Sequence, residues 1–171
     1  MTAYVALLRA VNVGGTGKLP MTELKAMCEA AGFGQVHTYI ASGNVVFTSQ
    51  KSEDAVRAAI EKSLEKYAGK PVGVLVRTAA EMADTLERNP FGEKPGNRVV
   101  ALFVDEALPG DALDHAKGLK DEQMKLGKRE IYIFYGDGMA DSRLAIPAAK
   151  AGTARNMNTV AKLAEMAAAL H

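Results

Sequence analysis

The chain has 171 residues, 48% of them apolar, which is enough to fold unaided as one domain or as two small halves sharing a core. Its 21 Lys and Arg residues are balanced by 20 Asp and Glu residues, for a formal charge of +1. This balance excludes a strong field for gathering nucleic acid or anionic membrane, although it leaves room for a local basic pocket.

The cysteine and histidine content argues against disulfides and metal clusters. The single cysteine, Cys28, cannot form an internal disulfide, and the three histidines lack the spacing of metal ligands. The N-terminus has no signal-peptide pattern, and no run reaches the ~18 to 20 apolar residues of a membrane span. We therefore expect a cytoplasmic protein with no metal, no cofactor and no membrane partner.

The first half of the chain alternates between strand-like and helical apolar patterns. Predicted strands cover residues 4–11, 35–40, 43–48 and 72–77. A predicted helix covers residues 21–31, and another runs from the cap Ser52, through a face formed by Val56, Ile60, Leu64 and Tyr67, to the stop Gly69. The resulting βαββαβ order is that of the ferredoxin-like split βαβ unit.

The second half repeats this theme less regularly. Thr78 and Glu81 form a capping box for a helix that Asn89-Pro90 ends. Further strands are predicted at residues 99–104, 123–126 and 131–135, and further helices at residues 109–119 and 160–170. We predict an α+β fold of two ferredoxin-like (βαββαβ) halves, residues 1–78 and 79–171, packed as one cooperative unit, with antiparallel sheets and helices on one face.

Three short polar clusters lie where a strand ends or a helix begins. Asn, Ser, Gly and Arg at such places supply amide, hydroxyl and guanidinium groups, which is the chemistry of holding a ligand. The predicted ligand-binding residues are Arg9, Asn12, Ser42, Asn44, Arg155, Asn156 and Asn158. In ferredoxin-like topology the first strand runs antiparallel to the third, so Asn12 should meet the 42–44 turn at one end of the sheet.

Each cluster also has a structural interpretation. Arg9 on an apolar strand face is more often held in a buried ion pair than by a ligand. Asn12 and the glycine-rich residues 14–18 can simply turn the chain, because their spacing is not that of a phosphate-binding P-loop. For Asn44 a turn and a ligand contact are equally favoured. Either Asn of the third cluster can cap the last helix, whereas Arg155 beside that helix start also suits an anion.

Several separated motifs resemble those of one protein family. They are ALLRAVNVGG (6–15), LPM (19–21), TYIASGNVVF (38–47), NPF (89–91) and TARNMNTV (153–160). Together they resemble an uncharacterised, mostly bacterial family catalogued as a domain of unknown function, from near residue 4 to near residue 165. The resemblance implies paired ferredoxin-like halves and no established activity. Ala10, Ala41 and Met157 stand where that family has Gly, Gln and Trp, and Met157 cannot stack on a flat ligand as Trp would.

The leading hypothesis is a binding module for a polar or anionic small molecule, such as a nucleotide or phosphate ester. Arg9 or Arg155 would neutralise its charge, while the Asn amides would orient it. RNA binding is an alternative that the 6% aromatic content and the near-neutral charge disfavour. A third is an enzyme that draws an acid or base from Asp105, Glu130 or His37. No catalytic residue is assigned, and the sequence leaves the oligomeric state open.

Overall fold

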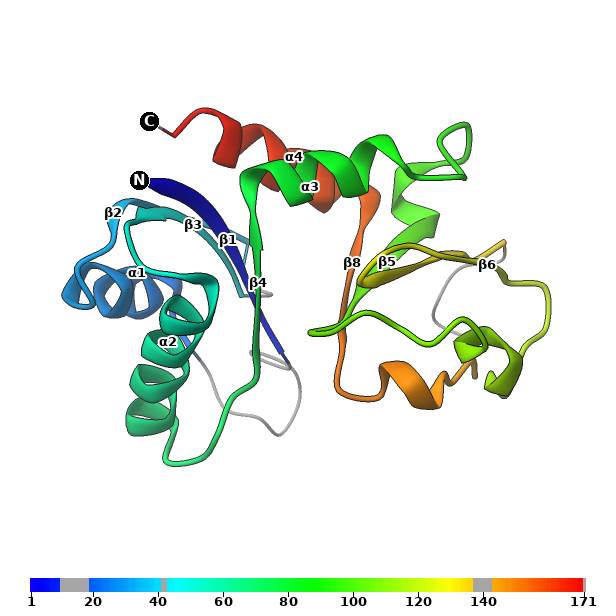
Figure 1. Ribbon diagram of the computed structural model, residues 1–171, viewed down its shortest axis with the longest axis horizontal. Helices are drawn as coiled ribbons and strands as arrows, with labels where there is room; N and C mark the ends of the chain where they lie inside the picture. The colour runs from blue at the N-terminus through cyan, green and yellow to red at the C-terminus, as the bar shows by residue number, and fades with distance from the viewer. Residues whose placement is uncertain (10–18, 41–42, 137–142, 171) are drawn as a thin grey trace. The chain divides into compact units, whose positions relative to one another are not determined.

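The protein is described by a computed structural model covering residues 1–9, 19–40, 43–136 and 143–170 (Figure 1). Over these residues it forms four α-helices and two four-stranded antiparallel sheets, which confirms the predicted α+β class. The fold divides into two compact units: unit 1 is Met1–Ala83 with Leu163–His171, and unit 2 is Asp84–Lys162.

Unit 1 contains the first sheet, sheet A, with its strands in the order β2-β3-β1-β4. Its elements are β1 (Thr2–Leu8), α1 (Met21–Ala30), β2 (Gly34–Tyr39), β3 (Asn44–Ser49), α2 (Glu53–Ala68) and β4 (Val74–Thr78). All neighbouring strands are antiparallel, and α1 and α2 cover one face of the sheet (Figure 1). This element order and strand order confirm the ferredoxin-like topology predicted for the first half.

Local signals account for the bounds of α2. The Ser52 side chain accepts a hydrogen bond from the Ala55 amide at 3.3 Å, and Gly69 ends the helix in a left-handed conformation with φ of +75°. The predicted apolar face is buried at Val56, Ile60 and Leu64. Tyr67, predicted to continue that face, is instead 48% exposed, because it lies in the last turn of the helix.

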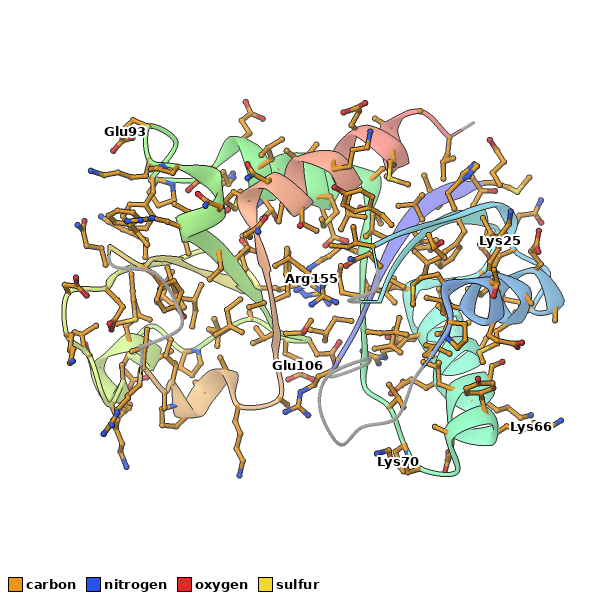
Figure 2. The ribbon with its side chains drawn as sticks, turned by 180° about the vertical axis from the view of Figure 1, so that it is seen from behind. Lys25, Lys66, Lys70, Glu93, Glu106 and Arg155 are labelled. Carbon is orange, nitrogen blue, oxygen red and sulfur yellow. The ribbon has the colours of Figure 1, made fainter. Side chains whose placement is uncertain are left out.

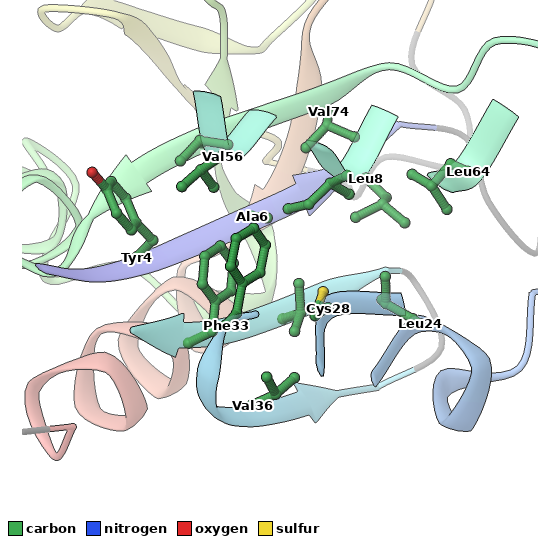
Figure 3. Packing of buried hydrophobic residues seen from close by; sticks show 14 of the residues in the cluster. Tyr4, Ala6, Leu8, Leu24, Cys28, Phe33, Val36, Val56, Leu64 and Val74 are labelled. Atoms are coloured by element: carbon green, nitrogen blue, oxygen red, sulfur yellow. The ribbon is translucent and has the colours of Figure 1, made fainter. Parts of the chain in front are cut away.

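The core of unit 1 lies between sheet A and its two helices (Figure 3). The side chains of β1 that face the helices, Tyr4, Ala6 and Leu8, pack against residues of β3, β4, α1 and α2. At the centre of this core the rings of Phe33 and Phe47 stack with centroids 4.4 Å apart. Burying such rings removes a large apolar area from water, which makes this cluster a main source of stability for the unit.

Unit 2 contains sheet B, with its strands in the order β6-β7-β5-β8. These strands are β5 (Val99–Phe103), β6 (Gln123–Leu126), β7 (Glu130–Phe134) and β8 (Thr153–Asn156). The helix α3 (Ala79–Glu87) precedes them, and α4 (Met157–Ala168) follows them. Taken in chain order, the four strands of sheet B have the same neighbours as those of sheet A, so the second half keeps the ferredoxin-like strand order.

The helix predicted at residues 109–119 is wrong. That segment contains only a short 3-10 helix, η2 (Ala112–His115), and the corresponding crossover before β8 contains another, η3 (Pro147–Ala149). The backbone of Lys117 forms two 2.8 Å hydrogen bonds with Ala145, and Gly118 has a φ of +73°. Both features end helical geometry, so paired loops carrying 3-10 turns supply the crossovers in this half.

Candidate functional site

The strand ends that were predicted to converge do so at one end of sheet A. The amide of Leu8 donates to the carbonyl of Gly43 at 2.8 Å, and the amide of Arg9 donates to the carbonyl of Gly73 at 2.9 Å. Three chain segments therefore meet beside the end of β1. Asn12 and Ser42, which were predicted to complete this cluster, lie outside the described residues.

Arg9 is exposed at this end of the sheet, so its expected burial on an apolar face is wrong. The physical reason is that β1 ends at Leu8, the residue before Arg9, whereas the predicted strand continued to residue 11. A Cβ built at Gly73 would lie 3.5 Å from both Cβ and Cδ of Arg9, so the aliphatic stem runs alongside that glycine. A guanidinium on such a stem is accessible to a ligand.

Asn44 is fully buried at the start of β3, where its side-chain amide donates to the carbonyl of Tyr39 at 3.0 Å. This hydrogen bond ties together the two strands of the hairpin. It gives Asn44 a definite structural role at a strand position where Asn is otherwise uncommon.

The third predicted cluster lies at the junction of β8 and α4 in unit 2. Arg155 projects from β8, is buried, and donates from Nη1 to Thr153 Oγ1 at 2.7 Å and to the Ala154 carbonyl at 3.0 Å (Figure 2). Burial lowers the pKa of Arg155 to about 10, so the guanidinium remains charged at neutral pH. Arg155 thus carries a buried charge directly before a helix.

The two asparagines of that cluster have different surroundings. Asn156 caps α4, because its Oδ1 accepts a hydrogen bond from the Thr159 amide at 2.9 Å, as its structural interpretation predicted. Asn158 is exposed, and its amide lies so close to Gly96 that a Cβ there would collide with it. Asn158 is therefore the more exposed of the pair.

A second group of polar residues, not singled out from the sequence, surrounds a pocket of about 480 Å³ in unit 2. Its walls come from the C-terminal end of α3 and from the β6–β7 hairpin. The lining residues are Arg88, Pro90, Lys125, Leu126, Gly127, Lys128 and Tyr132. Three cationic side chains therefore share one hollow with three apolar or aromatic ones.

A hydrogen bond between β7 and α3 joins the two walls of this pocket. The predicted capping box starts α3, since the Thr78 amide donates to Glu81 Oε1 at 2.9 Å and the Glu81 amide donates to Thr78 Oγ1 at 3.1 Å. The hydroxyl of Tyr132 on β7 then donates to the carbonyl of Thr85 in α3 at 2.8 Å. Burial raises the pKa of Tyr132, so its phenol remains a hydrogen-bond donor at neutral pH.

Two carboxylates lie beside the cations. Asp84 Oδ1 is 2.9 Å from Arg88 Nε, and its Oδ2 is 3.3 Å from Lys128 Nζ. The hydrogen bond from Arg88 holds the pKa of Asp84 below its ordinary value. Glu130 is buried under the hairpin, where its Oε1 accepts from the Lys128 backbone amide at 3.1 Å. With Arg88, Lys125 and Lys128 set against these two carboxylates, the group keeps one positive charge.

The sequence carries a partial signal for this pocket. Positive charge is concentrated around Gly127, at Lys125 near the end of one predicted strand and at Lys128 and Arg129 in the turn before the next. The signal does not include Arg88, because 36 residues separate it from Lys125 and only the packing of α3 on β7 brings the two segments together.

Within the described ranges no group of three His, Cys, Asp or Glu side chains is arranged to hold a metal ion. Cys28 is buried in the core of unit 1, and burial raises its pKa to about 12, so the thiol packs as a small apolar group. Among the helices the structure describes, none has the length and apolar character needed to cross a bilayer.

Comparison with known proteins gives a family match and a similarity to solved structures. The family described as "Protein of unknown function (DUF1697)" matches residues 1–132. The chain is also similar to the solved structure of conserved bacterial protein SP0830 from Streptococcus pneumoniae, with 27% sequence identity and a TM-score of 0.79. That similarity covers 97% of this chain and 98% of the other. No curated protein matches the chain.

Proposed function

This chain belongs to the DUF1697 family of proteins of unknown function, and we propose that it binds a small anionic molecule in the basic pocket of unit 2. The observation that carries the proposal is the shared lining of Arg88, Lys125 and Lys128 in a hollow of about 480 Å³. That volume is within the range of small-ligand pockets, and charge-assisted hydrogen bonds from such side chains are the usual way to hold a phosphate or carboxylate.

The apolar part of the lining supports a ligand larger than an inorganic ion. Pro90, Leu126 and Tyr132 offer contact to an organic group, whereas the cations hold its charged end. A nucleotide or another phosphate ester has both parts. We place this binding in the cytoplasm, the compartment that suits a chain with one buried cysteine.

Removing two of the three cations should weaken binding at least about tenfold, since each charge-assisted hydrogen bond contributes roughly 1.5–3 kcal/mol. The variant is the double substitution Lys125→Gln and Lys128→Gln. The measurement is isothermal titration calorimetry with phenyl phosphate and with adenosine monophosphate at low ionic strength. Both lysines are exposed, so the variant should unfold at the temperature of the wild type.

The matched control is the double substitution Lys66→Gln and Lys70→Gln, which removes the same charge from exposed lysines near the end of α2 (Figure 2). It should leave the affinity nearly unchanged. Equal weakening in both double variants would mean that the probes respond to net charge alone. Absence of binding to the wild type would count against the pocket.

We propose the residues chosen from the sequence as a second ligand site, centred on the end of sheet A. The convergence of Leu8, Gly43 and Gly73 beside the exposed Arg9 supports it. Arg9→Gln should then weaken binding of the same two probes by roughly threefold to tenfold. An unchanged affinity would remove Arg9 from the ligand-binding set.

That second proposal includes Asn12 and Ser42 on the sequence prediction alone, because both lie outside the described residues. We propose the cluster of Arg155, Asn156 and Asn158 in unit 2 separately, where the buried charge of Arg155 and the exposed amide of Asn158 would serve an anionic ligand. Because Arg155 is buried and bonded to its own strand, the exposed Arg9 gives the cleaner test.

A further inference from the structure

The ion pairs of Asp84 bridge the two walls of the basic pocket. Arg88 follows α3 and Lys128 lies in the β6–β7 turn, yet each cation contacts a different oxygen of the same carboxylate, at 2.9 and 3.3 Å. A carboxylate is a flat anion with two acceptor oxygens. Its position therefore marks a point where this protein already accommodates negative charge between the two cations.

These ion pairs can be displaced by a ligand. The side chains of Asp84, Arg88 and Lys128 are 35%, 58% and 63% exposed. Exposed ion pairs contribute little to stability because water screens them, so breaking them leaves the fold intact. An incoming anion that offers more or stronger contacts to the same cations can therefore replace the carboxylate.

The third cation selects the class of ligand. Lys125 lines the same pocket and is exposed, and the strand register places it directly opposite Tyr132. A phosphate group has three terminal oxygens and carries close to two negative charges above its second pKa of about 6. It can thus engage Arg88, Lys128 and Lys125 together, which a carboxylate with two oxygens cannot do as well.

On the basis of the function proposed above, we propose that the pocket takes a phosphomonoester and that Asp84, paired with Arg88 and Lys128 of its lining, competes with the phosphate for these two cations. The organic part of the ligand lies against Pro90, Leu126 and Tyr132. Asp84 lowers the affinity of the site, because a phosphate that binds the same donors of Arg88 and Lys128 must first displace its carboxylate. Most substitutions in a binding site weaken binding, whereas removing a competitor strengthens it.

The test is calorimetric titration of the wild type and Asp84→Asn at pH 8 with phenyl phosphate, with benzoate and with an oligouridylate of eight nucleotides. Asp84→Asn should tighten phenyl phosphate binding roughly threefold to tenfold, which corresponds to the release of two exposed ion pairs. Phenyl phosphate should bind the wild type at least about tenfold more tightly than benzoate. Asp84→Ser should act in the same direction and serves if the Asn variant does not fold.

Asp54→Asn is the matched control, because Asp54 is also an exposed helical carboxylate paired with an arginine, Arg57, at 3.3 Å. Like Asp84→Asn, it removes one negative charge, but it does so in unit 1, and it should not change the affinity. A gain of equal size in Asp54→Asn would overturn the competitor role, and so would unchanged or weaker binding in both Asp84 variants.

The remaining outcomes separate the two proposals. Benzoate binding as tightly as phenyl phosphate would overturn the phosphomonoester class but retain the anion pocket. If oligouridylate bound more tightly than phenyl phosphate, the phosphomonoester class would be overturned and the ligand would be a nucleic-acid phosphodiester. Binding seen only in Asp84→Asn would support the competitor role, and no binding of any probe to any variant would overturn the proposed function as well.

Discussion

Replacing Phe47 with alanine is expected to lower the free energy of unfolding by about 3–5 kcal/mol. Phe47 is fully buried on β3, stacks on Phe33 at a ring angle of 9° and meets the ring of Tyr4 at 5.9 Å between centroids. Truncation removes buried apolar surface and leaves a cavity that the two neighbouring rings cannot close by themselves. For a chain of this length the midpoint of thermal unfolding should fall by roughly 6–20 °C.

Calorimetric or circular dichroism melting measures this effect, with Tyr67→Ala as the control. Tyr67 is also an aromatic residue of unit 1, but its 48% exposure means that its removal should change the midpoint by only a degree or two. If the two predicted halves form one cooperative unit, Phe47→Ala shifts a single transition. A loss of under 1 kcal/mol would contradict the central position of this ring stack.

The first half of the chain could be predicted because its signals are local. Ser52 and Gly69 bound α2, and the spacing of Val56, Ile60 and Leu64 defines its buried face within a few turns. The strands of this half follow from short apolar runs, and the βαββαβ order leaves few topologies to choose from. The convergence of Leu8 with Gly43 then follows from the antiparallel pairing of β1 and β3.

The second half could not be predicted to the same extent, because its crossovers depend on contacts distant in sequence. Residues 109–119 contain Ala112, Leu113 and Ala116 at spacings that also suit a helix. The backbone pairing of Lys117 with Ala145 prevents this helix from forming. No local sequence pattern near residue 117 indicates a partner 28 residues away. A tertiary contact here overrides a weak local propensity.

The basic pocket was missed for a related reason. Its cations come from two segments that are brought together by the hydrogen bond from Tyr132 to the Thr85 carbonyl, 47 residues apart. Asn44 and Asn156 are of a residue type that is typical of ligand loops. The structure gives both of these amides backbone hydrogen bonds. Polar residues at element ends serve capping and turns as readily as ligands, so residue type alone does not separate the two roles.

Replacing Gly118 with alanine should destabilise unit 2 by roughly 3–5 kcal/mol, through backbone strain and a steric clash together. Gly118 has a φ of +73°, and a Cβ there would collide with the carbonyl oxygen of Arg143. The colliding atom belongs to the backbone of the partner loop, so it cannot rotate away as a side chain would. Relief of the clash must therefore disturb the adjacent pairing of Lys117 with Ala145, which joins the loops that carry η2 and η3.

Two further alanine variants separate the causes in the same denaturant titration. Gly69 has a φ of +75° but no atom near the position of a Cβ, so Gly69→Ala should show the backbone strain alone, about 1–2 kcal/mol. Gly110 has open space and no positive φ, so Gly110→Ala should change stability by less than about 1 kcal/mol in either direction. If Gly118→Ala destabilised the protein no more than Gly69→Ala, the close approach of the two loops would not contribute to stability. The stability of unit 2 would then come from the packing of sheet B. If Gly118→Ala destabilises the protein more than Gly69→Ala does, the pairing of the two loops stabilises unit 2. In this half the paired loops then take the place that α1 and α2 have in stabilising sheet A.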